Sequence, residues 1–156
     1  MKIEIALCLP RDAETVAVVR DVAVGALGRL GVKESCVDDI RLALSEACTN
    51  VLDHSGAEDE YEVRLEVEDN RCEISVVDAT YSFDSSSLDL AMPDPMSPRG
   101  RGLAIMRSMV DQIRFTSEPA AGTIVHLVKT LELDPTGSMQ RLLDRGDRRT
   151  EPRAGA

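Results

Sequence analysis

Two runs of alternating apolar and charged residues, either side of Asp69-Asn70, most constrain how this chain can fold. The apolar members are Tyr61, Val63, Leu65 and Val67 in the first run and Cys72, Ile74 and Val76 in the second. A period of two is typical of strands that are buried on one face only. Asp and Asn are common turn residues. The segment therefore predicts an antiparallel hairpin whose apolar face must be covered by other elements.

Two amphipathic helices before the hairpin can provide that cover. A strand is predicted over 3–9, after which Asp12 is a suitable N-cap and Gly31 a suitable end for the first helix. Ser35 is a suitable cap for the second helix, which we expect to end near Ser55-Gly56. The apolar stripes have helical spacing and consist of Val16, Val19, Ala23, Ala26, Leu27 and Leu30 in the first helix and Ile40, Ala43, Leu44, Ala47 and Val51 in the second.

The second half of the chain predicts a third helix over 100–110 and two more strands, over 112–117 and 123–133. The preceding segment, 79–99, is rich in Pro and Ser and has no period, which is typical of a lid or binding loop; an insertion without a role is the alternative.

We therefore predict an α/β (α+β) two-layer sandwich, with a mixed, mostly antiparallel sheet and helices on one face. We expect one domain over 1–133 and a polar, Arg-rich tail over 134–156. That tail should be largely disordered apart from a possible short helix over 139–145.

The charge and cysteine content narrow the possible partners. The net charge of −10 argues against direct binding to nucleic acid or to an anionic membrane. The four cysteines form no Cys-x-x-Cys or zinc pattern, and the sequence has neither a signal-peptide profile nor a long apolar run. A cytoplasmic protein with reduced thiols is expected. A basic protein surface, or a nucleotide carried with a divalent cation, would suit its charge.

Glu46 and Asn50 are the first candidate site residues. They are four residues apart, so they share one face of the second helix, where a carboxylate and a carboxamide can hold a metal ion beside a reacting group. Such a pair alone is usually a solvated helix face. Here Asp78 ends an apolar strand, and Gly100 and Gly102 open a helix, which is a suitable phosphate site. The glycines match neither a P-loop nor a dinucleotide fingerprint.

In this order and spacing, these motifs resemble the N, G1, G2 and G3 boxes of the GHKL ATPase superfamily, which has the histidine-kinase-like (Bergerat) ATPase fold. The matching segments are Glu46-Ala-Cys-Thr-Asn50, Asp78, Gly100-Arg-Gly-Leu103 and Gly122-Thr123. The phrases SEACTNVLDH and GRGLAIMRSMVD are most similar to the anti-sigma-factor serine kinases of bacterial partner-switching systems. The resemblance extends over roughly residues 5 to 132.

The resemblance implies ATP and Mg²⁺ as cofactors and gives roles to individual residues. Asn50 would coordinate the Mg²⁺ that bridges the phosphates, and Glu46 would act as the general base or orient the nucleophile. Asp78 would accept a hydrogen bond from the adenine amino group. The other residues predicted to contact the nucleotide are Asp53, Arg99, Gly100, Arg101, Gly102, Leu103 and Thr123.

The implied function is that of an ATP-dependent serine/threonine kinase and anti-sigma factor. It would phosphorylate an anti-anti-sigma (STAS-type) protein, sequester a sigma factor and act as a homodimer. One departure keeps an alternative open, because Thr80 and Ser82 occupy positions where the G1 box of the family usually has glycine. The alternative is a non-catalytic binding module of the same fold with weakened or lost ATP binding. A fragment of a larger sensor kinase or gyrase-like machine is disfavoured, since we recognise no transducer or dimerisation segment.

Overall fold

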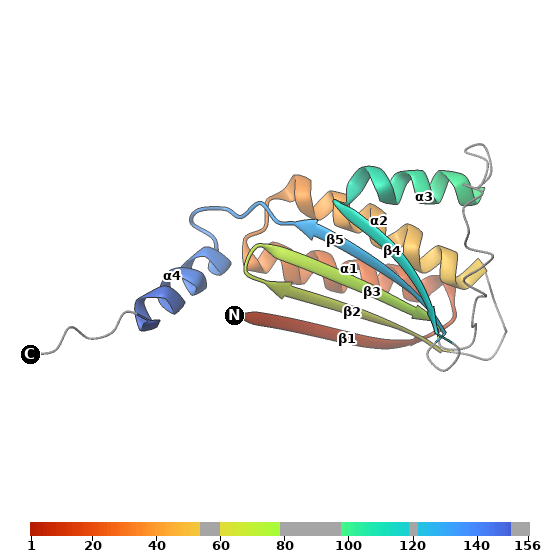
Figure 1. Ribbon diagram of the computed structural model, residues 1–156, viewed down its shortest axis with the longest axis horizontal. Coiled ribbons are helices and arrows are strands. Elements are labelled where there is room, and N and C mark those ends of the chain that lie inside the picture. Colours follow the sequence, from red (N-terminus) through yellow and green to blue (C-terminus); the bar gives the residue numbers. More distant parts are fainter. Residues whose placement is uncertain (54–59, 79–97, 119–121, 151–156) are drawn as a thin grey trace, which may run out of the picture.

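The computed structural model describes residues 1–53, 60–78, 98–118 and 122–150 and shows a two-layer α/β sandwich (Figure 1). Helices α1 (Ala13–Leu30), α2 (Glu34–Asp53) and α3 (Pro98–Met109) cover one face of a sheet. The strands of this sheet are β1 (Lys2–Pro10), β2 (Glu60–Glu68), β3 (Arg71–Asp78), β4 (Gln112–Glu118) and β5 (Gly122–Thr130). The predicted fold class is thereby confirmed.

The strand order is β1-β2-β3-β5-β4, and every described pair is antiparallel. The sheet is therefore purely antiparallel in the described strands, whereas we had predicted a mixed sheet. The reason is that β3 and β4, which are joined through α3, run in the same direction but are separated by β5. In this register Asp78 lies opposite Tyr61 on one side and opposite Thr123 on the other.

The ends of α1 are fixed by the residues that the sequence indicated. Asp12 has an extended backbone, and its Oδ1 accepts the N–H of Glu14 at 2.8 Å. Gly31 has φ +84°, a left-handed conformation that favours glycine, and its N–H donates to the carbonyl of Gly28 at 3.1 Å. The predicted N-cap and C-cap of this helix are both confirmed.

The start of α2 differs from the prediction, because the helix begins at Glu34 and Ser35 lies inside it. The carbonyl of Lys33 accepts the N–H groups of Cys36 and Val37, both at 3.0 Å. The N–H of Lys33 donates to the carbonyl of Glu132 at 2.8 Å. A long-range backbone contact therefore fixes where α2 starts, and no local capping motif could reveal it.

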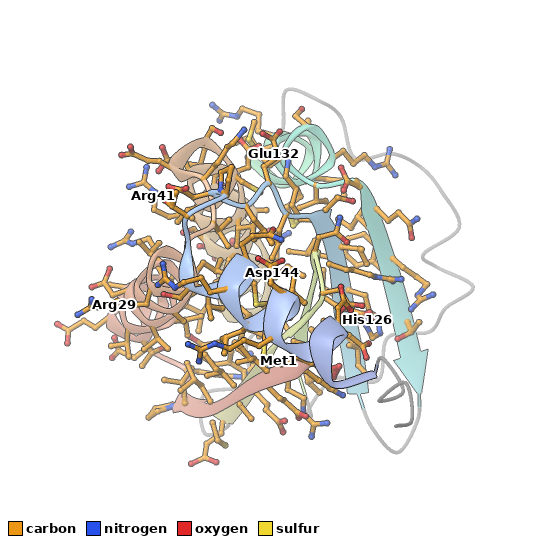
Figure 2. The ribbon with its side chains drawn as sticks, turned by 90° about the vertical axis from the view of Figure 1, so that its left-hand side faces the viewer. Met1, Arg29, Arg41, His126, Glu132 and Asp144 are labelled. Atoms are coloured by element: carbon orange, nitrogen blue, oxygen red, sulfur yellow. The ribbon has the colours of Figure 1, made fainter. Side chains whose placement is uncertain are left out.

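The core lies between the sheet and the helices. Its buried members are mostly Val, Leu, Ile and Ala, and the largest side chain among them is that of Tyr61. The predicted apolar face of α2 is buried, and the alternation in β2 and β3 directs every second residue inward. The alternation leaves polar residues such as Arg64, Glu73 and His126 on the other face of the sheet, and Figure 2 labels His126. The hairpin predicted from the two alternating runs is confirmed as β2–β3, with its turn at Asp69 (φ +52°).

The C-terminal segment is more ordered than predicted. Strand β5 ends at Thr130, and helix α4 (Ser138–Thr150) follows, where mostly disorder was expected. Met139 has 0% exposure, so the helix is attached to the core. Gly31 and Gly137 permit this attachment, because a Cβ at Gly31 would lie 2.6 Å from the Cα of Gly137. Residues 151–156 lie outside the described part of the chain.

Candidate nucleotide site

Glu46 and Asn50 lie on α2 where α3 crosses it, and both side chains are half-buried. Gly102 is buried in α3 directly against them. A Cβ added at Gly102 would lie 2.7 Å from Glu46 Oε2 and 3.6 Å from Asn50 Oδ1. At the first distance an added Cβ would displace the Glu46 carboxylate, so the glycine is what lets the carboxylate occupy this position. The structure thus brings together the N-box pair and the second glycine of the G2 box.

Asp78 ends β3 and is buried, with only 3% of its surface exposed. Its Oδ1 forms an ion pair with Nη2 of Arg11, and the side chains of both residues are 4% exposed. The same guanidinium donates from Nη1 to the carbonyl of Val51 on α2 at 2.9 Å. The carboxylate predicted to contact adenine is therefore part of a buried charge pair.

Arg11 was missed by the sequence reasoning. It directly follows β1 and precedes the N-cap Asp12, which is ordinary for a solvated turn. Its partners are on β3 and α2, both distant in sequence. The only signal was its position between a strand and a helix cap, which does not identify a buried residue.

A buried polar network lies beside this ion pair. Tyr61 is 1% exposed, and its hydroxyl is 2.7 Å from Thr15 Oγ1. Thr15 Oγ1 also donates to the carbonyls of Pro10 at 3.0 Å and Asp12 at 2.7 Å. Burial raises the pKa of Tyr61, against the opposing effect of its Thr15 hydrogen bond, so this hydroxyl is neutral at ordinary pH. The turn that carries Arg11 is thus attached to the sheet.

The other predicted nucleotide contacts are distributed around these residues. Asp53 is the exposed last residue of α2. Gly100, Arg101 and Leu103 belong to the start of α3, where Gly100 is buried, Arg101 exposed and Leu103 half-buried. Pro98 is the first residue of this helix, a position that suits proline.

Arg99 and Thr123 are placed by their backbones only, in α3 and β5. Most of the predicted lid (79–97), together with Thr80, Ser82 and the turn over 119–121, lies outside the described residues. So does the predicted end of the second helix at Ser55-Gly56.

Cys48, next to the N-box pair in sequence, is fully buried, as expected for a small apolar residue. Burial raises the pKa of its thiol to about 12. A nucleophilic thiolate at this position is therefore disfavoured at neutral pH.

Two further properties of the described residues concern metal binding and membrane insertion. Within residues 1–53, 60–78, 98–118 and 122–150, no group of three or more His, Cys, Asp or Glu side chains is arranged to hold a metal ion. In the same part of the chain, no helix combines the length and apolar character needed to cross a bilayer. The oxygen atoms of Glu46 and Asn50 do match the ligand preference of Mg²⁺, which needs few protein ligands when phosphates supply others.

Comparison with known proteins supports the interpretation of this region as a nucleotide site. The family model described as the histidine kinase-like ATPase domain matches residues 9–129. The serine-protein kinase RsbW of Bacillus thuringiensis (strain Al Hakam) is 32% identical over 122 residues, covering 72% of this chain and 76% of that protein. RsbW of Bacillus subtilis (strain 168) is 31% identical over 134 residues, covering 79% and 82%.

Solved structures share the fold at lower identity. The structure of the RsbU and RsbW domains of Rv1364c from Mycobacterium tuberculosis has a TM-score of 0.63 and 22% identity, covering 83% of this chain and 32% of that one. The structure of the SiaB–SiaC complex from Pseudomonas aeruginosa has a TM-score of 0.60 and 15% identity, covering 80% and 88%. At these identities the likeness establishes the architecture alone.

Proposed function

Since this chain belongs to the histidine kinase-like ATPase domain family and resembles its RsbW serine-protein kinases, we propose that it is an ATP-dependent serine/threonine kinase and anti-sigma factor. In a partner-switching system it phosphorylates a STAS-type anti-anti-sigma protein and sequesters a sigma factor. It acts in the cytoplasm as a homodimer. The observation that carries this proposal is the close approach of α3 to Glu46 and Asn50 at Gly102, since it brings the two candidate site residues of α2 against the glycine-containing helix predicted to hold the phosphates.

The residue roles are those that the family resemblance implies, and the chemistry of the residues supports them. Asn50 Oδ1 would hold the metal ion, and the first turn of α3, which begins at Pro98 and includes Gly100, would hold phosphate oxygens, while Gly102 lies one turn further on against Glu46. Arg99, Arg101 and Leu103 complete this phosphate end of the site. Magnesium-ATP, when bound, supplies the phosphoryl group and neutralises its charge.

The adenine base and the partner's serine nucleophile contact opposite ends of the site. The Asp78 carboxylate accepts a hydrogen bond from the exocyclic amino group of adenine, and Thr123 lies opposite it on the neighbouring strand. Asp53, the last residue of α2, is the remaining predicted contact. The carboxylate of Glu46 accepts the proton of the partner's serine hydroxyl. Because phosphoryl transfer depends on positioning and charge stabilisation, these few groups suffice.

The test compares Glu46→Gln and Asn50→Ala with the unaltered protein. Glu46→Gln should bind magnesium-ATP normally but transfer phosphate to a STAS-type protein about 10² to 10⁴ times more slowly, the usual effect of losing a general base. Asn50→Ala should lose magnesium-dependent ATP binding. Calorimetry measures binding and radiolabelled ATP measures transfer. The matched control is Glu34→Gln, an exposed glutamate at the start of the same helix.

The non-catalytic binding module stays open as a second candidate because of Thr80 and Ser82 in the G1 segment. It predicts that unaltered protein and Asn50→Ala show equal, negligible ATP binding while partner binding persists without nucleotide. Phosphoserine on the partner that depends on Glu46 would exclude it. Light scattering on the purified chain tests the homodimer.

A further inference from the structure

Arg11 connects the two ends of the candidate nucleotide site. Its guanidinium pairs with Asp78, the proposed base contact, and donates to the carbonyl of Val51, the residue after Asn50. The end of β1, the end of α2 and the end of β3 lie at the same edge of the molecule, on the right of Figure 1. One buried side chain outside the family's nucleotide motifs therefore joins three elements, two of which carry predicted ligand contacts.

Burial and geometry give this contact its importance. A charge removed from water needs a paired charge and hydrogen bonds, and both side chains here are only 4% exposed. A guanidinium donates in fixed directions from a rigid plane, so it orients a carboxylate as well as compensating its charge. An ionised carboxylate is a pure acceptor with two oxygens, which is what the amino group of adenine requires.

We propose that Arg11 is a positioning residue of the nucleobase site, holding the Asp78 carboxylate in the orientation that accepts a hydrogen bond from the adenine amino group. This inference rests on the proposed function. The Thr15–Tyr61 network supports it, because it fixes the turn that carries Arg11, and Tyr61 lies directly opposite Asp78 in the sheet. The position of the guanidinium is thus set by the fold before any nucleotide binds.

A positioning role and a purely structural role differ in which ligand they affect. If Arg11 only stabilised the fold, its loss would weaken all nucleotides alike. If it positions Asp78, its loss should weaken ATP more than purine ribonucleoside triphosphate, which lacks the exocyclic amino group. The ratio of these two dissociation constants is therefore the informative readout.

The experiment measures both dissociation constants, with magnesium, for the full chain and for Arg11→Met and Arg11→Lys. The control is Arg29→Met, the same change at an exposed arginine in the last turn of α1. The unaltered protein and Arg29→Met should prefer ATP by about tenfold or more, as expected for a hydrogen bond to a charged group. Arg11→Met should lose most of that preference. Arg11→Lys keeps the charge but not the planar fork, and should retain only part of it.

Circular dichroism establishes that each variant is folded. If Arg11→Met does not fold, the ratio for Arg11→Lys decides the question. An unchanged ratio in the folded Arg11 variants, or a rise in ATP affinity, would overturn the positioning role and leave the proposed function intact. Failure of the unaltered protein to bind either nucleotide would overturn both.

Discussion

At the scale of single residues, Gly102 occupies a position where any side chain would meet the Glu46 carboxylate. Gly102 is buried where α3 meets α2, within contact distance of the Glu46 carboxylate. The glycines inside α1 have no such role, since a Cβ at Gly25 or at Gly28 would meet nothing within 4 Å. Substitution by alanine should therefore disturb the candidate site at Gly102 and leave it unchanged at Gly25.

Gly102→Ala should weaken magnesium-ATP binding by about tenfold or more, which corresponds to about 1.4 kcal/mol. The added methyl would lie 2.7 Å from Glu46 Oε2, so the carboxylate or the helix must move. Gly25→Ala is the control and should keep the affinity while stabilising the fold by about 0.5–1 kcal/mol. Calorimetry and urea unfolding measure the two effects. Equal affinities in the two variants would contradict the steric argument.

His126 links protonation to stability on the polar face of the sheet. Its Nδ1 lies 3.1 Å from Ser75 Oγ and its Nε2 3.3 Å from Thr116 Oγ1. Burial, followed by the charge of Arg114, lowers the pKa of His126 below its ordinary 6.5, although Glu73 acts in the opposite direction. The unfolded chain therefore binds the proton more readily than the folded one. Stability due to this group is complete above pH 6.5 and decreases as the pH falls through that value.

We accordingly expect the free energy of unfolding to decrease more between about pH 7.5 and about pH 5.5 in the unaltered protein than in His126→Gln. Urea unfolding at the two pH values measures this. The relevant quantity is the difference between the two slopes, because carboxylates contribute to both proteins. Identical slopes would show that the folded environment does not shift this histidine.

At the scale of elements, α4 extends the domain beyond the family match, which ends at residue 129. Its attachment depends on Met139, with 0% exposure, and on the Gly31–Gly137 approach at the turn between α1 and α2. The N–H of Asp134 also donates to the carbonyl of Gly31 at 2.7 Å. The helix is therefore packed onto the same turn that positions the start of α2.

Met139→Ala should lower the free energy of unfolding by about 2–5 kcal/mol, the usual cost of removing a large buried side chain. Leu142→Ala in the same helix is the control, because Leu142 is 39% exposed and should change stability by less than about 1 kcal/mol. Urea unfolding of both variants decides the matter. If both variants lose the same amount, Met139 is packed no more tightly than the exposed Leu142, and the attachment of α4 to the core through Met139 is contradicted.

Across the whole molecule, the cysteines report on the integrity of the core. Cys8 is exposed, whereas Cys36, Cys48 and Cys72 are buried. Burial raises the pKa of the Cys48 and Cys72 thiols to about 12. Since the thiolate is the reactive form, neither buried thiol should react at neutral pH.

A disulfide reagent should therefore modify only Cys8 in the native protein, slowly at neutral pH because the hydrogen bond to Glu60 raises the pKa of its thiol, and all four thiols after unfolding in urea. Absorbance of the released thiolate measures this, and Cys8→Ser should abolish the native-state reaction. Rapid modification of further thiols in the native Cys8→Ser protein would indicate that the core opens more easily than its packing suggests.

The features that the sequence predicted correctly are those encoded by local periodicity or local capping. The stripe of α2, the β2–β3 hairpin and the Asp12 cap belong to this class. The errors involve long-range pairing. The start of α2 depends on Glu132, and the order of α4 depends on Gly31.

The candidate site divides in the same way. The spacing of Glu46 and Asn50 on one helix is local, and their proposed roles stay predictions. The partner of Asp78 is not local. No sequence pattern could indicate that Arg11 would be buried beside it, because their contact requires β1 and β3 to be joined through β2.

The strand order also determines when the Arg11–Asp78 pair of the proposed nucleobase site can form during folding. The β2–β3 and β4–β5 hairpins connect neighbours in sequence, whereas β1 pairs with β2 across two intervening helices, from Lys2↔Glu68 to Pro10↔Glu60. Contacts between distant segments require closure of long loops and form slowly. We expect β1 to dock late, so that Arg11 reaches Asp78 only when the sheet is nearly complete. A chain still folding would then possess the phosphate end of its site before it could recognise a nucleobase.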